Sequence, residues 1–214
     1  DDSKLTASSH FAIYGGYALD ASAENNLVEI KNGSYVAGEI VGAISSVRVQ
    51  SSSILIDSST IEGDVSVFDG GASTAGAGRI TISGESDVKK AGLHPHQINE
   101  FKGTSDTELV LDGFRGAVGQ IGFVDVNSQN EMQNIHAFDR IKFLNQSWSE
   151  SSPIIAISNG DAASVFAKSS FTDDSLSFVN PEAILPGSSI TLVSIESDGS
   201  KTLLYADPDS PDTR

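Results

Sequence analysis

Short pairs of branched apolar residues recur along the first half of the chain, with one residue of variable chemistry between the two members. Three copies, Val28-Glu29-Ile30, Ile54-Leu55-Ile56 and Ile80-Thr81-Ile82, are spaced 26 residues apart, and Leu109-Val110-Leu111 follows after 29. This alternation is the period of a strand that turns every second side chain toward a core. A repeat of this length predicts stacked coils that bury their apolar faces against one another, with the last residues of the pairs in one column.

A second strand follows the first within each repeat. Val36-Ala37-Gly38-Glu39-Ile40 matches Ile61-Glu62-Gly63-Asp64-Val65 position by position at a distance of 25 residues, and the third repeat retains Val88. Short turns, Asn32-Gly33-Ser34 and Asp57-Ser58-Ser59, separate the two strands of a coil. We therefore predict an all-β fold with two parallel strands per coil, in which the turns absorb changes of length because their backbone groups reach water.

The period extends over residues 1–134 and then breaks. From residue 135 onward the apolar residues come in separate short runs, and Asn159-Gly160 and Asp198-Gly199 are signals for two-residue hairpins. We predict that residues 135–206 form an antiparallel β cap, which covers the apolar cross-section and the free strand edge of the last coil.

Four apolar residues at the start of this cap are expected to seal the last coil: Ile135, Phe138, Ile141 and Phe143. Residues 207–214 contain no aliphatic or aromatic side chain. We predict a disordered linker for them, since such a segment buries too little apolar surface to fold.

The chain carries 29 acidic and 13 basic residues and a formal net charge of −16. Nucleic-acid binding is disfavoured, because affinity for nucleic acid comes chiefly from cations that neutralise phosphates. We interpret the acidity as a source of solubility, with calcium binding as the alternative. Cysteine is absent, so stability is expected to come from stacking rather than from disulfides.

Several segments together resemble the C-terminal part of the passenger of bacterial autotransporters, the type V secretion route. These segments are Ile13-Tyr14-Gly15-Gly16-Tyr17, residues 25–33, the run from Asn134 to Phe143, and the run from Leu185 to Leu192. The resemblance implies a right-handed parallel β-helix exported to the surface of a Gram-negative bacterium through an outer-membrane translocator barrel C-terminal to this fragment. It also implies an autochaperone-like cap that folds first and templates the coils behind it.

Many parallel β-helices are carbohydrate-active enzymes, and such an enzyme needs two carboxylates on one surface, about 5–10 Å apart. Glu62 and Asp64 flank Gly63, and Glu39 is expected to stack beside them at the ~4.8 Å spacing of strands. This ladder could host hydrolysis or bind calcium. We favour a plain solvated edge, since no aromatic or histidine residue lies near it in the sequence.

Other candidate residues are given structural interpretations. His94-Pro95-His96 is the one histidine pair with metal-like proximity, but no Cys or third His is nearby in the sequence, so we expect an irregular insertion rather than zinc. Trp148 is expected to lie over the edge of the cap rather than to anchor a partner. Lys31 and Asp57 occupy equivalent positions one coil apart, which predicts a cross-coil ion pair.

The sequence therefore favours a non-enzymatic, surface-exposed passenger fragment, either a stalk or an adhesin-like module. We expect it to be a monomer without catalytic residues, metal or cofactor, and its partner would be a protein or glycan on a host or cell surface. One alternative is a fragment of a carbohydrate-active β-helix enzyme. Another is a trimer of the kind that phage tail spikes form.

Overall fold

The computed structural model describes residues 3–18, 20–69, 75–96, 106–114, 116–129, 131–145, 155–157, 165, 168–172, 176–178, 190–197 and 200–206. In this part of the chain there are twenty β-strands. The first ten are β1 (Lys4–Tyr14), β2 (Tyr17–Ala18), β3 (Ser22–Ala23), β4 (Asn26–Ile30), β5 (Tyr35–Ser45), β6 (Arg48–Asp57), β7 (Thr60–Glu62), β8 (Val65–Asp69), β9 (Ala75–Ser83) and β10 (Val88–His96). The others are β11 (Asp106–Asp112), β12 (Gly116–Ile121), β13 (Phe123–Val126), β14 (Met132–His136), β15 (Arg140–Leu144), β16 (Ile155–Ile157), β17 (Ser170–Thr172), β18 (Leu176–Phe178), β19 (Ile190–Ser197) and β20 (Ser200–Ala206).

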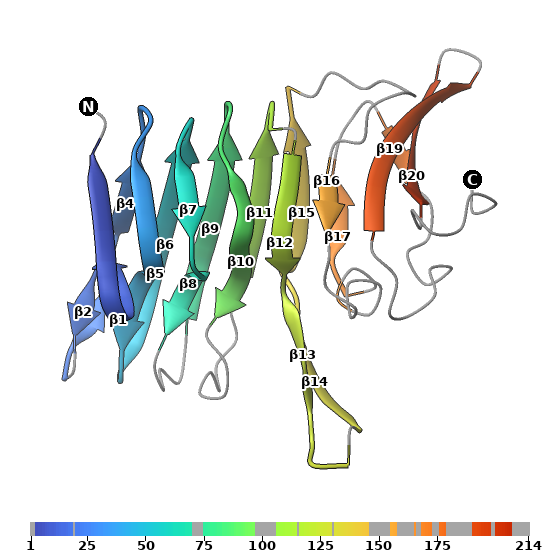
Figure 1. Ribbon diagram of the computed structural model, residues 1–214. Helices are drawn as coiled ribbons and strands as arrows, with labels where there is room; N and C mark the ends of the chain where they lie inside the picture. The colour runs from blue at the N-terminus through green and yellow to red at the C-terminus, as the bar shows by residue number, and fades with distance from the viewer. Residues whose placement is uncertain are drawn as a thin grey trace.

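The strands form two large sheets that face each other along the stack, and the chain alternates between them (Figure 1). One sheet has the order β1-β5-β8-β10-β12-β16-β19-β20-β18, and the other has the order β17-β15-β11-β9-β6-β3, with β4 also paired to β6. Strands of successive coils pair in parallel, as in β4–β6, β6–β9 and β9–β11. The predicted parallel β-helix, or β-solenoid, is therefore confirmed.

The apolar pairs of the repeat lie in register through the whole stack. Ile30 pairs with Ile56, Ile56 with Ile82, Ile82 with Leu111, and Leu111 with Phe143. All five side chains are buried, with at most 5% of their surface exposed. The predicted column is confirmed, and it continues one coil further than the sequence pattern indicated.

A second column, composed of one residue per turn, runs along the turns. The residue two positions after each member of the inward column has a positive φ: Asn32 (59°), Ser58 (49°), Gly84 (59°), Gly113 (62°) and Asn145 (51°). Glycine adopts this left-handed conformation freely, and asparagine tolerates it better than most other residues. The same sharp turn thus recurs in every coil and returns the chain to the opposite sheet at a constant position.

Parallel pairing continues past residue 134, where we expected the stack to end. Ile141 pairs in parallel with Leu109, β17 continues from β15, and β16 pairs in parallel with β12. Residues 141–143 and 155–157, which we assigned to separate cap strands, therefore belong to the stack. The repeat was missed because its offset here is 32 residues, stretched by an inserted hairpin. That residues 135–206 form a separate unit stays a prediction.

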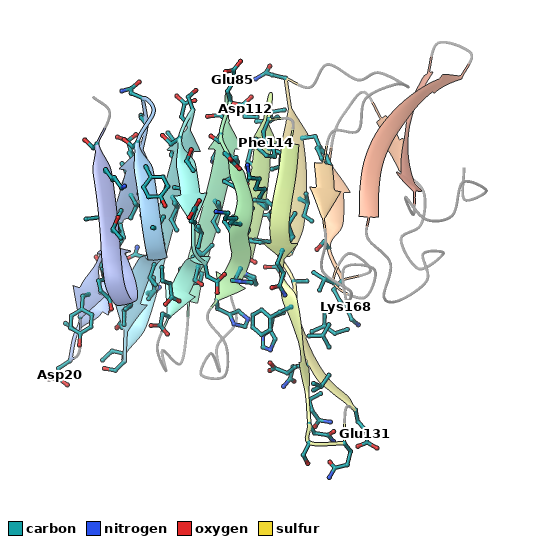
Figure 2. All side chains as sticks on the ribbon, viewed as in Figure 1. Asp20, Glu85, Asp112, Phe114, Glu131 and Lys168 are labelled. Carbon is teal, nitrogen blue, oxygen red and sulfur yellow. The ribbon has the colours of Figure 1, made fainter. Side chains whose placement is uncertain are left out.

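The inserted hairpin consists of β13 and β14, which pair only with each other in the described part of the chain. It projects away from the stack, and Glu131 lies near its far end (Figures 1 and 2). We call residues 123–136 the arm. Ile135, expected to seal the last coil, pairs with Val124 within the arm instead and is only half-buried.

Beyond the parallel coils lies an antiparallel segment, as predicted. β16 pairs antiparallel with β19, and β19 pairs antiparallel with β20. Ser197 pairs with Ser200, which leaves a two-residue connection at the predicted Asp198-Gly199. Asn159-Gly160, Trp148 and residues 207–214 lie outside the described residues. No helix in the described part of the chain is long and apolar enough to span a membrane.

The turn column generates a prediction from two glycines with similar φ and different surroundings. A Cβ at Gly113 would meet only the carbonyl oxygen of Asn145, at 3.7 Å, whereas a Cβ at Gly84 would lie 2.3 Å from Ser58 Oγ and 2.8 Å from Asp57 Oδ1. Gly113→Ala should cost about 1–2 kcal/mol, the price of a left-handed alanine. Gly84→Ala should cost clearly more. Urea unfolding of both variants measures the difference, and equal costs would contradict close coil-to-coil packing at Gly84.

Phe138 provides a test of the end of the stack, because its side chain is fully buried in the core cluster together with Ile141 and Phe143. Phe138→Ala should reduce the free energy of unfolding by about 3–5 kcal/mol through lost burial and the cavity left behind. Ile135→Ala is the matched control, with a smaller expected loss because Ile135 lies on the arm. A larger loss for Ile135 than for Phe138 would show that this placement is wrong.

Candidate functional site

The three carboxylates of the predicted ladder do not stay together. Ala37 pairs with Glu62 and Ile40 pairs with Val65, so Glu39 comes beside Asp64 while Glu62 faces an alanine. Between these pairs Gly63 has a φ of 148°, and a Cβ there would lie 2.4 Å from the carbonyl oxygen of Gly38. The close approach of the two glycine backbones separates Glu62 from the other two acids.

Glu62 takes part in a bridge across three successive coils. Its Oε1 accepts a hydrogen bond from Lys90 Nζ at 2.7 Å, and its Oε2 accepts one from Tyr35 Oη at 3.0 Å. These bonds, that of Lys90 first, lower the pKa of Glu62 below its usual value. Glu62 is therefore a bridging anion in the structure rather than a proton donor.

Glu39 and Asp64 have environments that move their pKa values in opposite directions. Burial, followed by the nearby charges of Asp64 and Asp69, raises the pKa of Glu39 to about 7. A hydrogen bond with His94 is the main cause that lowers the pKa of Asp64, although the burial of Asp64 opposes it. Such a divergent pair is the usual arrangement of a general acid beside an ionised carboxylate.

Tyr14 and His94 approach this pair, although they are distant from it in the sequence. Burial first, and then the charges of Asp69 and Glu39, raise the pKa of the Tyr14 hydroxyl. His94 Nε2 lies 3.7 Å from Asp64 Oδ1. A Cβ at Gly92 would lie within 2.5 Å of both of these atoms, so the glycine makes room for their contact. The absence of an aromatic or histidine neighbour, which we noted in the sequence, does not hold in three dimensions.

His94 lies on β10 and not in an irregular insertion, so this expectation was wrong. Its side chain is 6% exposed, and it pairs with Ser66 of the neighbouring strand. Ser66 Oγ and His94 Nδ1 are both buried without a hydrogen-bond partner. Asp64, His94 and Ser66 thus follow the order of a nucleophile triad, but Ser66 is 0% exposed and no substrate could reach its hydroxyl.

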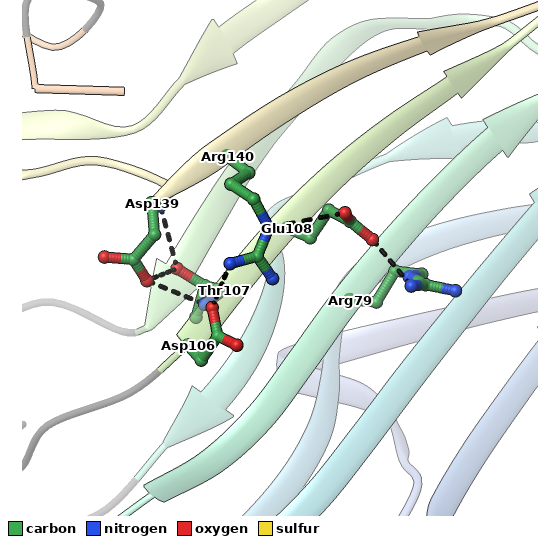
Figure 3. Close-up of polar contacts among 6 residues, drawn as sticks. All are labelled: Arg79, Asp106, Thr107, Glu108, Asp139 and Arg140. Carbon is green, nitrogen blue, oxygen red and sulfur yellow. Dashed lines mark hydrogen bonds and ion pairs between the residues drawn. The ribbon is translucent and has the colours of Figure 1, made fainter. Parts of the chain in front are cut away.

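A polar groove lies on the outer face of the other sheet. It has a volume of about 250 Å³ and is lined by Ser51, Ser52, Ser53, Ala77, Gly78, Arg79, Asp106, Glu108 and Arg140. Glu108 lies between two arginines from the adjacent coils, 2.7 Å from Arg79 Nη2 and 3.5 Å from Arg140 Nε (Figure 3). The side chain of Glu108 is 10% exposed, so this ion pairing is partly shielded from water.

Two further contacts fix the end of this groove. Arg140 Nη1 donates a hydrogen bond to Asp106 Oδ1 at 2.5 Å, and this bond is the main cause that raises the pKa of the guanidinium. Asp139 Oδ2 accepts hydrogen bonds from the backbone N–H and the hydroxyl of Thr107, at 2.7 and 2.9 Å (Figure 3). Sequence reasoning missed this network, although Arg79 and Glu108 each come immediately before an apolar pair of the repeat.

The remaining predicted contacts have simple outcomes. Lys31 pairs with Glu29 on its own strand end at 2.8 Å, while Asp57 Oδ1 accepts a hydrogen bond from Ser83 Oγ, so the predicted Lys31–Asp57 ion pair is wrong. Among the residues that the structure describes, no three His, Cys, Asp or Glu side chains are grouped so that they could hold a metal ion together. Glu39, Glu62 and Asp64 therefore do not form a calcium cage.

Comparisons of the chain with protein-family models, with curated proteins and with solved structures gave no match.

The raised pKa of Glu39 generates a prediction with a defined sign. Because the folded-state pKa of about 7 exceeds the ordinary value of 4.5, ionisation favours the unfolded chain, and stability is lost as the pH rises from 4.5 through 7. Glu39→Gln removes this loss, so the variant should gain stability relative to the wild type between about pH 5 and pH 8. Urea unfolding across this range measures the gain.

Glu62→Gln is the matched control, because the pKa of Glu62 is lowered. The ionised form of Glu62 is favoured by folding, so this variant should lose stability relative to the wild type as the pH rises above the ordinary carboxyl range. If the two variants show the same pH dependence, the assigned environments of the two acids are wrong.

Proposed function

We propose that this chain is a structural module, a stalk or adhesin-like segment of a surface-exposed passenger, and that it has no catalytic role. The observation that carries the proposal is that each sheet has a polar bridge on its outer face across three consecutive coils. Tyr35, Glu62 and Lys90 form one bridge. The second consists of Arg79, Glu108 and Arg140.

These bridges use side chains that a catalytic surface would leave available for substrate. Glu62 contacts two neighbours and Glu108 contacts two arginines, so both acids serve coil-to-coil attachment. A single exposed ion pair contributes little, roughly 0–1 kcal/mol, whereas a series of bridged coils resists the separation of any one coil from the next. That property suits a segment that must keep its length and present a surface.

The structural roles of the autotransporter-like residues support the finer proposal of a type V passenger. A Cβ at Gly15 would lie 2.3 Å from the carbonyl oxygen of Gly42, and one at Gly16 would lie 1.7 Å from Asn26 Oδ1, so the Tyr-Gly-Gly-Tyr element is where coils come very close. Phe138 and Phe143 of the second element are buried in the core. We propose surface display on a Gram-negative bacterium on this basis.

A carbohydrate-active enzyme is the second candidate, and the divergent pKa values of Glu39 and Asp64 favour it. The acid–base pair would then be Glu39 and Asp64, in place of the pair Glu62 and Asp64 expected from the sequence. We rank it lower because the polar groove lies on the other sheet, away from this pair.

The proposal predicts the behaviour of the full-length protein on the cells that make it. Protease added to intact cells should release fragments of this chain, and antibodies to it should label unpermeabilised cells. Cleavage and labelling only after lysis would contradict surface display. The periplasmic or cytoplasmic marker of the same cells must stay intact as the control.

Catalysis is tested separately with the purified chain and a panel of acidic and neutral polysaccharides. We expect no turnover above that of the Asp64→Asn variant. Turnover that disappears in both Glu39→Gln and Asp64→Asn, but persists in Glu62→Gln, would overturn the structural role in favour of the enzyme.

A further inference from the structure

Three side chains form a connected row where the arm joins the stack. His136, the last residue of β14, places Nδ1 3.1 Å from Nε2 of His96, at the end of β10. Its other nitrogen, Nε2, lies 2.7 Å from Asp125 Oδ2 on β13. The ring of Phe123 stacks on the imidazole of His136 with centroids 4.1 Å apart. Residues 40 positions apart in the chain are therefore held together at this junction.

Asp125 determines which nitrogen of His136 carries the proton. An ionised carboxylate only accepts hydrogen bonds, so Nε2 of His136 must donate to it. In the neutral ring Nδ1 then has a lone pair, and this lone pair faces Nε2 of His96. A carboxylate behind a histidine, with the opposite ring nitrogen left as a ligand, is the usual second shell of a metal-binding imidazole.

The spacing of the two facing nitrogens also fits a shared metal ion. Zinc lies about 2.0–2.1 Å from each histidine nitrogen that binds it. Two nitrogens 3.1 Å apart would subtend roughly 100° at such an ion, between the octahedral and tetrahedral angles. The rings are nearly perpendicular, at 79°, with centroids 4.6 Å apart, so neither ring obstructs the other.

We propose that His96 Nε2 and His136 Nδ1 bind one divalent transition-metal ion, with Zn²⁺ as the first choice, and that the ion clamps the arm to the stack. Imidazole nitrogen suits zinc, copper and nickel better than calcium or magnesium. The net charge of −16 attracts cations to the chain as a whole. Water completes the coordination shell, so the affinity is lower than that of a four-ligand structural site.

The site agrees with the other residues around it. The side chains of His136 and Asp125 are 13% and 21% exposed, which shields the junction and still leaves a route for water and the ion. His94 lies on the same strand as His96, but its Nε2 faces Asp64, and we do not include it as a ligand. On binding, the ring proton of His96 moves to Nδ1, so that both ligands are neutral imidazoles.

The test is titration of the whole 214-residue chain, freed of metal with a chelator, with Zn²⁺ in a calorimeter. We expect one ion per chain. His96→Gln and His136→Gln should each lower the affinity at least tenfold. His10→Gln, which removes the histidine on β1, should leave it unchanged. The melting temperature should rise with Zn²⁺ in the wild type and in His10→Gln only.

Asp125→Asn separates ligation from a purely structural role, because both ligands remain. It should lower the affinity about 10–100-fold, as loss of a second-shell carboxylate does. It also decides the matter if a histidine variant fails to fold. No zinc binding by the wild type, or binding that survives His96→Gln and His136→Gln, would overturn the proposal, and the three residues would then be a hydrogen-bonded row only.

Discussion

The fold depends on the register between successive parallel coils. A coil in this chain has no core of its own, because its inward side chains meet mainly those of the coils before and after it. Ile56 is buried because Ile30 and Ile82 lie directly beside it in the column. A shift of one residue in any coil would turn that coil's whole apolar set outward. The left-handed residue that follows each apolar pair by two positions keeps this register, since it ends the strand at the same place in every coil.

The two sides of the coil differ in how much variation they accept. The turn after the inward pair begins alike in every coil, whereas the connection on the other side varies from two residues between β5 and β6 to the whole arm between β12 and β15. Length changes are tolerated there because a surface loop costs little additional closure entropy as it grows. The arm is such an insertion, and it brings His136 to His96 of the preceding coil without disturbing the column. New chemistry can thus be added at this edge while the stack stays the same.

The sequence predicted the parts of the structure that repeat. The apolar columns, the two strands per coil and the turns at Asn32 and Ser58 follow from period and turn chemistry alone. The fifth coil was missed because the arm stretches its offset, and the pattern of two apolar residues with one between them is too short to recognise at an unexpected distance. The site was predicted less well. Glu62 parts from Glu39 because of the glycine contact at Gly63, and His94 reaches Asp64 only through strand pairing. Both depend on register at single residues, which sequence spacing alone does not determine.

The acidic composition imposes a problem that any parallel stack must solve. Equivalent positions superpose at the ~4.8 Å spacing of strands, so like charges at one position repel each other strongly. The structure shows three solutions. Arg79, Glu108 and Arg140 alternate in sign along one column. Glu62 turns away at a glycine contact and pairs with Lys90 of the next coil. Glu39 has neither option beside Asp64 and Asp69, and its raised pKa means that it keeps its proton up to about pH 7. The unusual acid is therefore explained by the geometry of stacking, and catalysis is not needed to account for it.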